Sequence, residues 1–378
     1  KYTFVWLKSI SKYYERLRAK VDKFFVEIST KYWLVEEMEL DLLTQMEGIL
    51  KKLKKIAKRK NIVFVYGKGR RKSQMQRDIE QLNEYIKKMK KYERYFEIFR
   101  GRNSFSKTDI DATFMRMKDD HMRNGQLKAA YNIQLAVSGE YIVGVDVSNE
   151  RSDNKTLIGF LERLESQFGK RFLNIIADAG YESEEIYNYL ASKNYVSYIK
   201  PINHETKKTR KYKKQIGRRE NMTYDEKKDE FICHNNRRLK YIYTSKRKKE
   251  SGYEAKSRVY ECESCDNCEF RLQCFKGKKN KRIFFSPLFT EYREESQRNI
   301  DSELGILFRI NRSIQTEGAF GVLKQDYMFN RFKYRGEIGA FFEVLLYAMA
   351  FNVNKLHNKI QDNRLGLSFF YPKDNKVA

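Results

Sequence analysis

Residues 173–190 read LNIIADAGYESEEIYNYL, and this stretch decides the fold class of the chain. The apolar run 173–177 is typical of a short buried strand, and it ends at an acidic residue, Asp178. Ser183 follows with two acidic residues behind it, which is the usual start of a helix. A strand that leads into a helix indicates an α/β architecture. It also puts Asp178 at the carboxyl edge of a sheet, where such folds form their active sites.

The sequence on both sides extends this pattern. Upstream, YNIQLAV (131–137) and YIVGVDV (141–147) flank a Ser-Gly pair and predict a β-hairpin. Residues 155–169 predict an amphipathic helix, and VSYIKP (196–201) predicts a further strand. Antiparallel strands followed by strands that alternate with helices predict a mixed α/β sheet.

Two basic regions accompany this core. Residues 1 to about 60, which end in a Lys-rich run, and residues 73–99 show apolar positions at helical spacing, so we expect helices there. Residues 203 to about 285 are dense in Lys and Arg and contain all five cysteines, with short β-like runs between them. This composition predicts a small β-rich insertion in the core.

The chain is expected to return to helices after Pro287, at residues 290–312, 313–326 and 338–357. The last of these is so apolar that it must be buried on several sides. We therefore predict five regions. They are a helical basic region (1–103), the first part of the core (104–202), the Cys-rich insertion (203–288), the C-terminal core helices (289–358) and a loose tail (359–378).

The charge of the chain indicates its class of partner. Its 378 residues include 77 Lys and Arg against 50 Asp and Glu, a net charge of +27. Such a surplus repels itself unless a polyanion offsets it, so nucleic acid is the expected partner. A membrane surface is the other common polyanion, but no apolar run approaches the ~20 residues that span a bilayer. With no secretory signal pattern at the N-terminus, we expect a cytoplasmic, nucleoid-associated protein.

Two further positions are candidate carboxylate ligands. Asp109 and Asp111 lie in SFSKTDIDATFM (104–115), a candidate first strand, where a spacing of two puts both side chains on one face. A carboxylate pair on a core strand is costly unless a cation compensates, although an edge strand would tolerate the same pair.

Glu317 is the last candidate, in a predicted helix that reads RSIQTEGAFGVLKQDY. Lys324 lies two turns further along the same face of that helix. Taken singly, Asp178 could be a turn residue and the Glu317–Lys324 pair a surface pair. Taken together, carboxylates on two strands and one late helix can hold two Mg²⁺ ions ~3.5–4 Å apart.

Four segments together resemble the bacterial insertion-sequence transposases of the DDE class, in the branch with an inserted β-domain and a Tyr-Arg-Glu-Lys signature. They are TDIDATFMRMKDDHMRNGQLKAAYNIQLAV (108–137), IIADAGYESEEIYNYL (175–190), the cysteine cluster, and RSIQTEGAFGVLKQDYMFNRFKYRG (312–336). The resemblance covers roughly residues 104–350. It implies a ribonuclease-H-like fold and the cleavage and strand transfer of double-stranded DNA at transposon ends, with Mg²⁺ or Mn²⁺ and in a homodimer on paired ends.

The resemblance also implies roles for single residues. Asp178 takes the place of the second metal-binding acid and Glu317 that of the third, whereas the first falls on Asp111 or Asp109, with Asp111 preferred. Lys324 matches the signature Lys, which contacts DNA phosphate. Arg312 is a further candidate for DNA binding, although it lies one residue further from Glu317 than the signature Arg, whose place is taken by Ser313. No residue matches the Tyr.

The cysteines read Cys262-x2-Cys265-x2-Cys268-x5-Cys274. Four thiolates at this spacing could close the tetrahedral shell of a structural Zn²⁺, and Cys233 or His234 could replace one of them. Free thiols are the alternative.

Basic side chains just after the Glu317 helix are candidates for contacts with the DNA backbone; they are Arg331, Lys333 and Arg335. The expected function is therefore DNA transposition. Two alternatives remain, a catalytically silent DNA-binding descendant of a transposase and a nuclease on the same fold.

Overall fold

The structure is a computed structural model that describes residues 4–34, 41–116, 125 and 127–371. The chain divides into two compact units, which are considered separately below. Unit 1 comprises residues 1–131 and 335–338, and unit 2 comprises residues 132–334 and 339–378. In the described part of the chain, no helix is long and apolar enough to cross a membrane.

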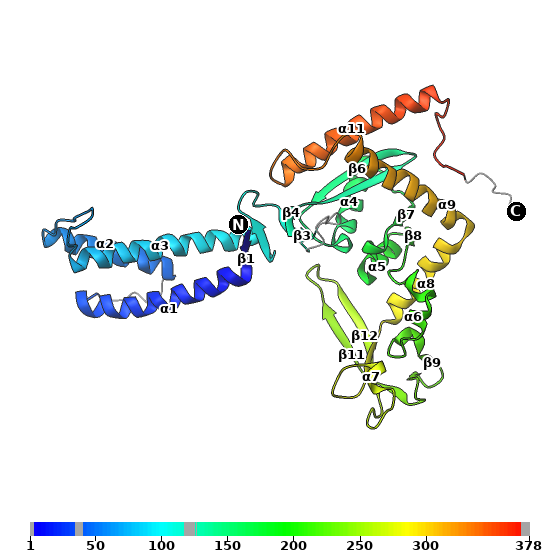
Figure 1. Ribbon diagram of the computed structural model, residues 1–378, viewed down its shortest axis with the longest axis horizontal. Coiled ribbons are helices and arrows are strands. Elements are labelled where there is room, and N and C mark those ends of the chain that lie inside the picture. The colour runs from blue at the N-terminus through cyan, green and yellow to red at the C-terminus, as the bar shows by residue number, and fades with distance from the viewer. Residues whose placement is uncertain (1–3, 35–40, 117–124, 126, 372–378) are drawn as a thin grey trace. The chain divides into compact units, whose positions relative to one another are not determined.

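Unit 1 is built on three long helices, α1 (Leu7–Tyr32), α2 (Leu42–Arg59) and α3 (Gln74–Phe99) (Figure 1). Their apolar faces share one core, and Asp41 and Ser73 cap α2 and α3 by accepting backbone N–H bonds. The buried Asp78 on α3 binds Lys31 and Tyr32 of α1 at 2.7 and 2.6 Å. The helices predicted before residue 100 are thus present, except that residues 4–6 form a strand. Residues 1–3 and 35–40 of that prediction lie outside the described residues.

Short strands complete unit 1. β1 (Phe4–Trp6) pairs with β2 (Ser104–Ser106), and β3 (Thr113–Arg116) pairs with β4 (Leu127–Ala130), both antiparallel. The candidate strand that included Asp109 and Asp111 is wrong in its details. The two residues lie in the turn between β2 and β3 and not within a strand.

Unit 2 begins with the predicted hairpin, in which β5 (Asn132–Ser138) pairs with β6 (Tyr141–Ser148). Helix α4 (Leu157–Phe168) packs on β6 at Gly144, where a Cβ atom would come within 2.4 Å of the Leu164 side chain. Only glycine therefore permits this close approach. β7 (Asn174–Ala177) and β8 (Val196–Ile199) then form a parallel pair, with α5 (Glu184–Ser192) between them in the chain.

The predicted mixed α/β architecture is confirmed by these elements. The hydrogen bonds, however, join the strands of the predicted core into separate two-stranded ladders, β3–β4, β5–β6 and β7–β8. The more specific ribonuclease-H-like sheet therefore stays a prediction.

The Lys- and Arg-rich region after β8 starts with a short helix, α6 (Arg210–Lys213), and continues as a five-stranded antiparallel sheet in the order β13-β12-β11-β10-β9. The strands are β9 (Thr223–Asp225), β10 (Glu230–Ile232), β11 (Arg238–Lys248), β12 (Glu254–Cys262) and β13 (Arg282–Phe285), with α7 (Arg271–Cys274) before the last. The sheet has its own small core around Leu239 and Tyr260. The β-rich character expected of this region is present, while its status as an inserted domain stays a prediction.

The C-terminal helices differ from the prediction in three places. The helix expected at 290–312 is two, α8 (Pro287–Asp301) and α9 (Glu303–Arg312), separated by the cap residue Ser302. The helix expected at 313–326 starts with a π-helical turn, Ser313–Glu317, before α10 (Gly318–Gln325). The tail expected to be loose is attached up to residue 371, since Phe370 exchanges two backbone hydrogen bonds with the Asn311 side chain; residues 372–378 lie outside the described residues.

The apolar helix predicted at 338–357 is present as α11 (Glu337–Gln361). Its inner face packs on β6 and α10 through Ala348 and Phe351. Burial on several sides, however, is wrong for the single chain, because the opposite face carries large exposed apolar side chains such as Leu346.

Candidate functional site

Asp178 lies where the sequence places it, directly after β7 at the carboxyl end of the parallel β7–β8 pair. Its Oδ1 accepts a hydrogen bond from Ala179 N at 2.7 Å, so the residue also caps the short turn Ala179–Tyr181. The side chain is 59% exposed. Asp178 therefore caps the turn through one carboxylate oxygen while most of its side chain remains exposed.

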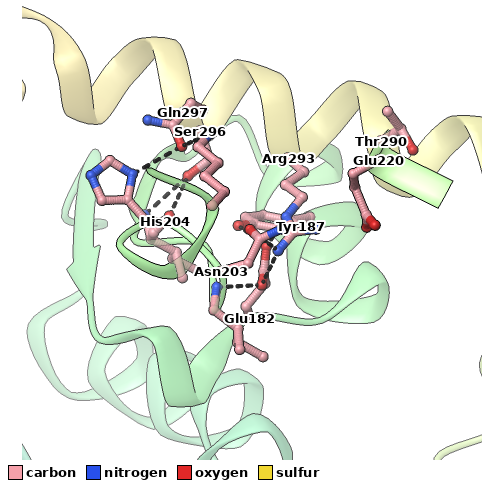
Figure 2. Close-up of polar contacts among 12 residues, drawn as sticks. Glu182, Tyr187, Asn203, His204, Glu220, Thr290, Arg293, Ser296 and Gln297 are labelled. Carbon is pink, nitrogen blue, oxygen red and sulfur yellow. Dashed lines mark hydrogen bonds and ion pairs between the residues drawn. The ribbon is translucent and has the colours of Figure 1, made fainter. Parts of the chain in front are cut away.

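The turn that carries Asp178 is anchored by a buried acidic residue, Glu182. Its side chain is 1% exposed and pairs with Arg293 of α8 at 2.7 Å. Glu182 also accepts hydrogen bonds from Ile202 N and the Tyr187 hydroxyl (Figure 2). Because α8 supplies the cation, this helix fixes where the 178–182 turn lies.

A second set of polar contacts ties α8 to the strand next to β7. Ser296 accepts a hydrogen bond from Ile199 N at 3.0 Å and donates one to Ile199 O at 2.9 Å (Figure 2). In the loop after β8, His204 contacts Gln297 at 3.1 Å. These hydrogen bonds fix β8, and through the β7–β8 pairing also the strand that ends at Asp178, against α8.

Glu317 closes the π-helical turn, and its side chain is 60% exposed. A π turn brings residues five apart onto one line, whereas an α-helix aligns residues four apart. The turn therefore accommodates one extra residue, and Arg312 reaches Glu317 at 3.2 Å across a spacing of five. Ser313, at the spacing of four that the signature expects, contacts Glu317 as well, through its hydroxyl at 3.1 Å.

Arg312 also reaches Asp178. Its Nη2 lies 3.6 Å from Asp178 Oδ1, while Nη1 lies 3.2 Å from Glu317 Oε1. One guanidinium thus brings together two carboxylates that are 139 positions apart in the sequence (317 − 178). Two of the three predicted acids are therefore neighbours in unit 2.

The π turn is held in place by Gln315. Its Oε1 accepts from Glu140 N in the β5–β6 turn at 3.1 Å, and its Nε2 donates to Asn311 and to the Ser368 carbonyl. The segment after α11 thus supports the turn that presents Glu317.

Residues that the sequence did not single out also lie near Asp178. A Cβ atom on Gly180 would come within 2.7 Å of Asp153 Oδ2, so a larger residue there would force the Asp153 carboxylate to shift. Asp153 Oδ1 accepts from Asn132 and Gln134 on β5 at 2.7 and 3.2 Å. The Asp-Ala-Gly order after β7 was the available signal, since a glycine there points to a close neighbour.

Tyr181 lies among these acids. Burial first, then the charges of Asp153 and Asp178, raise the pKa of its hydroxyl, while Arg312 opposes them. Asp146 acts on it as well and is paired with Arg163 at 2.6 Å. The hydroxyl therefore stays protonated and available as a donor at neutral pH.

Asp109 and Asp111 lie in unit 1, together with residues 335–338. Asp109 Oδ1 accepts from the Tyr131 hydroxyl at 2.8 Å and from Gly336 N at 3.2 Å, and Asp111 Oδ2 accepts from Glu337 N at 3.3 Å. Burial, followed by the bond to Asp109, raises the pKa of Tyr131. Backbone N–H groups thus donate hydrogen bonds to both acids. That either of them shares a site with Asp178 and Glu317 stays a prediction.

Of the predicted DNA contacts, Lys324, Arg331, Lys333 and Arg335 have exposed side chains. The side chain of Arg312, the fifth, is 23% exposed and pairs with Asp178 and Glu317. The loop that carries Lys333 is fixed from below, because the buried Glu343 of α11 accepts a hydrogen bond from Lys333 N at 2.9 Å.

β11 and β12 form a two-stranded ribbon (Figure 1), and the end of β11 carries the basic run Lys246–Lys248 from the Lys- and Arg-rich region. At its loop end, Lys249 pairs with Glu185 at 3.1 Å and Tyr253 donates to Glu184 at 2.9 Å. Both partners begin α5, directly after the turn of Asp178. The loop end of this lysine-bearing ribbon therefore contacts the first turn of α5.

The cysteines converge as well. Cys233, Cys262, Cys265, Cys268 and Cys274 all line one small cavity of about 20 Å³, and all five thiols are free. Burial, and then the neighbouring Cys265, raise the pKa of Cys262 to about 12, and burial raises that of Cys274.

Among the described residues, no group of three or more His, Cys, Asp or Glu side chains is arranged as a metal site. The predicted Zn²⁺ site therefore has no support beyond the convergence of the thiols. For Mg²⁺, the residues offer an exposed pair of carboxylates, Asp178 and Glu317. This ion commonly uses one or two carboxylates and completes its shell with water and substrate phosphate.

Residues 232–357 match the family model of the transposase DDE domain. The prediction from the sequence that the chain is related to DDE transposases is thereby confirmed, without its finer subdivision. The match includes Arg312, Glu317 and Lys324, while Asp111 and Asp178 lie before it. No curated protein and no solved structure matches the chain.

Proposed function

We propose that this chain, whose residues 232–357 match the family model of the transposase DDE domain, cuts double-stranded DNA at transposon ends and joins it to a target. The reaction class is metal-dependent attack of water or a DNA 3′-hydroxyl on a phosphodiester. The nucleophile comes from solvent or DNA, so no covalent bond to the protein forms.

The observation that supports this proposal best is the Asp178–Arg312–Glu317 contact. It joins a carboxylate at the end of a parallel strand to one on a helix far along the chain. In open α/β folds, the carboxyl ends of strands are the usual place for catalytic groups. Asp111, or else Asp109, is proposed to complete the set on a ribonuclease-H-like sheet.

Two Mg²⁺ or Mn²⁺ ions would be held with the help of the oxygens of Asp178 and Glu317, one to activate the nucleophile and one to stabilise the leaving oxygen. Arg312 holds the two carboxylates in place and offsets their mutual repulsion before DNA arrives. Lys324, Arg331, Lys333 and Arg335, with the β11–β12 ribbon, are proposed to bind the DNA backbone. A two-stranded ribbon also fits the width of a major groove.

The test is cleavage of a labelled DNA duplex that carries the ends of the element encoding this chain. Purified protein is expected to cut at those ends with Mg²⁺ or Mn²⁺ and to lose activity in EDTA. A protein that binds the ends but never cuts with either metal would instead be a silent DNA-binding descendant. Cutting at any duplex, without preference for the ends, would indicate a nuclease.

Replacing Arg312 by Ala tests whether this residue positions the two carboxylates, because the variant keeps both of the Mg²⁺ ligands. Without the guanidinium, the two carboxylates lose their shared cation, so we expect half-saturation at a lower Mg²⁺ concentration. We also expect a maximal cleavage rate reduced by about 10- to 100-fold, the loss typical of a misplaced reacting group. The measurement is a Mg²⁺ titration of the cleavage rate.

The matched control is Arg282→Ala, which removes an arginine from an ion pair with Glu261 in the β-sheet at 2.5 Å. It should leave both the Mg²⁺ midpoint and the maximal rate unchanged. An Arg312→Ala variant with the Mg²⁺ midpoint of the parent would contradict the assigned role.

A structural Zn²⁺ held by Cys262, Cys265, Cys268 and Cys274 is a separate part of the proposal, supported by their convergence on one cavity. Since zinc binds thiolates and Cys262 in the free form ionises only at a pKa of about 12, binding must release protons and strengthen as pH rises. Protein purified without chelator should contain about one equivalent of zinc and lose thermal stability in EDTA. Zinc-free protein of the same stability, with all five thiols open to titration, would refute this part.

A further inference from the structure

A cavity of about 490 Å³ lies within unit 1, between one face of α3 and β2 with the residues that follow it. Its lining residues are Lys90, Lys91, Arg94, Tyr95 and Ile98 on the helix, and Phe105, Lys107 and Ile110 on the other side. Steps of three and four residues put the side chains from Lys91 to Ile98 on one face of α3. The volume is that of a site for a small molecule, and none of the proposed catalytic residues lines it.

The cavity is strongly basic. Four of its eight lining residues are cations, and none of the eight is acidic. Lys90 is neutralised by Glu47 at 2.6 Å. Lys91, Arg94 and Lys107 are exposed and form no ion pair within the part of the chain that the structure describes. Three uncompensated cations around one cavity attract an anionic ligand.

The walls of the cavity are also aromatic and held in place by the fold. Phe105 is 1% exposed, and its ring centroid lies 5.4 Å from that of Tyr95 and 5.0 Å from that of Phe99. The hydroxyl of Ser106 accepts a hydrogen bond from Thr108 N at 3.3 Å, which fixes the loop after β2. The half-buried Tyr95 ring therefore stands next to the cations on a supported surface.

We propose that this cavity binds a nucleotide, with the base against Tyr95 and the phosphates at the three unpaired cations. The backbone of a DNA duplex would use the cations only, because its bases are stacked inside, whereas a nucleotide with an accessible base uses the aromatic wall as well. Such a nucleotide is either free in solution or unpaired in a DNA strand, and the recognition chemistry is the same. This inference goes beyond the proposed function, since it requires neither the carboxylates of unit 2 nor DNA cleavage.

The test is isothermal titration calorimetry of the nuclease-treated full chain in buffer without Mg²⁺ or Mn²⁺, so that the carboxylates of unit 2 do not take part. ATP, adenosine and tripolyphosphate are the probes. ATP should bind at about one equivalent per chain and at least about tenfold more tightly than tripolyphosphate, because only ATP stacks a base on the aromatic wall. Adenosine, which lacks the phosphates, should bind more weakly than ATP as well. Tripolyphosphate that binds as tightly as ATP would overturn the proposal.

Two variants connect the binding to the cavity. Arg94→Gln removes one unpaired cation, and Tyr95→Leu removes the ring while it keeps an apolar side chain, so each should weaken binding by about tenfold or more. Arg94 is exposed, so its replacement should leave the far-UV circular dichroism unchanged. Arg77→Gln is the control, since it removes the same charge from an exposed position of α3 outside the cavity, and it should bind as the parent does. An unchanged affinity in Arg94→Gln, or an equal loss in Arg77→Gln, would refute the site.

The source of the nucleotide is decided by repeating the titrations with a short single-stranded DNA and with its duplex. ATP binding that depends on Arg94 and Tyr95 indicates a free nucleotide, whereas the same dependence for the single strand alone indicates an unpaired nucleotide of DNA; either result supports the proposal. If neither ligand responds to the two variants, or if the duplex binds as tightly as the single strand, the cavity is only part of a basic surface and the proposal fails. A chain that binds the nucleotide in this way but never cuts DNA leaves this inference standing and refutes the proposed function.

Discussion

Replacing Asp178 by Asn, or Glu317 by Gln, is expected to reduce Mg²⁺-dependent cleavage by about a thousandfold or more. Each change keeps the shape of the side chain and removes the charge that a hard cation requires. Stabilisation of a developing charge by a bound metal is worth several kcal/mol, and each 1.36 kcal/mol corresponds to a factor of ten in rate. The measurement is single-turnover cleavage of labelled end DNA.

Both variants are expected to lose DNA cleavage but to keep DNA binding. Both carboxylates are mostly exposed, so their loss should cost little stability, and the DNA affinity of both variants should equal or exceed that of the parent. Asp301→Asn, at the end of α8, is a control for a carboxylate outside the site and should cut normally. If either site variant cuts as fast as the parent, the assignment of that carboxylate is wrong.

Replacing Arg293 by Met should be the most destabilising change of a single residue that we predict. Arg293 neutralises Glu182, which is 1% exposed, and the variant would leave that carboxylate buried without a cation. Removing one partner of a buried pair commonly costs about 3–5 kcal/mol of unfolding free energy. Cleavage should fall as well, because Glu182 anchors the turn that presents Asp178.

The double variant Glu182→Gln with Arg293→Met tests this cause. It removes both charges, so part of the lost stability should return, whereas independent effects would simply add. Arg298→Met, an exposed position on the same helix, should change stability by less than about 0.5 kcal/mol. Denaturant unfolding followed by circular dichroism gives all four values, and an Arg293→Met variant as stable as the parent would contradict the buried-pair argument.

The stretch around Asp178 shows which features can be predicted from neighbouring residues alone. The strand, the turn and the capped helix over residues 174–192 were all predictable, because an apolar run, a cap residue and an acidic first turn act over a few neighbouring residues. For the same reason Glu317 was correctly expected on a helical segment. The π turn was not predictable, since it depends on Gln315 binding Glu140 and Ser368, which are far away in the sequence.

The residues that surround the candidate site are brought there by the tertiary structure and could not be identified from the sequence. Asp153 and Asp146 looked like ordinary polar residues in the sequence, and only the packing of β5, β6 and α4 brings them towards Tyr181. Likewise, the composition of α11 predicted a helix buried on several sides, because hydrophobicity indicates that a surface is to be covered but not what covers it. The sequence by itself determined the α/β class, the basic charge and the carboxylates at the strand end and the late helix. The tertiary structure alone decided that one arginine joins two of those carboxylates and that one apolar face remains open, because both depend on contacts between residues far apart in the chain.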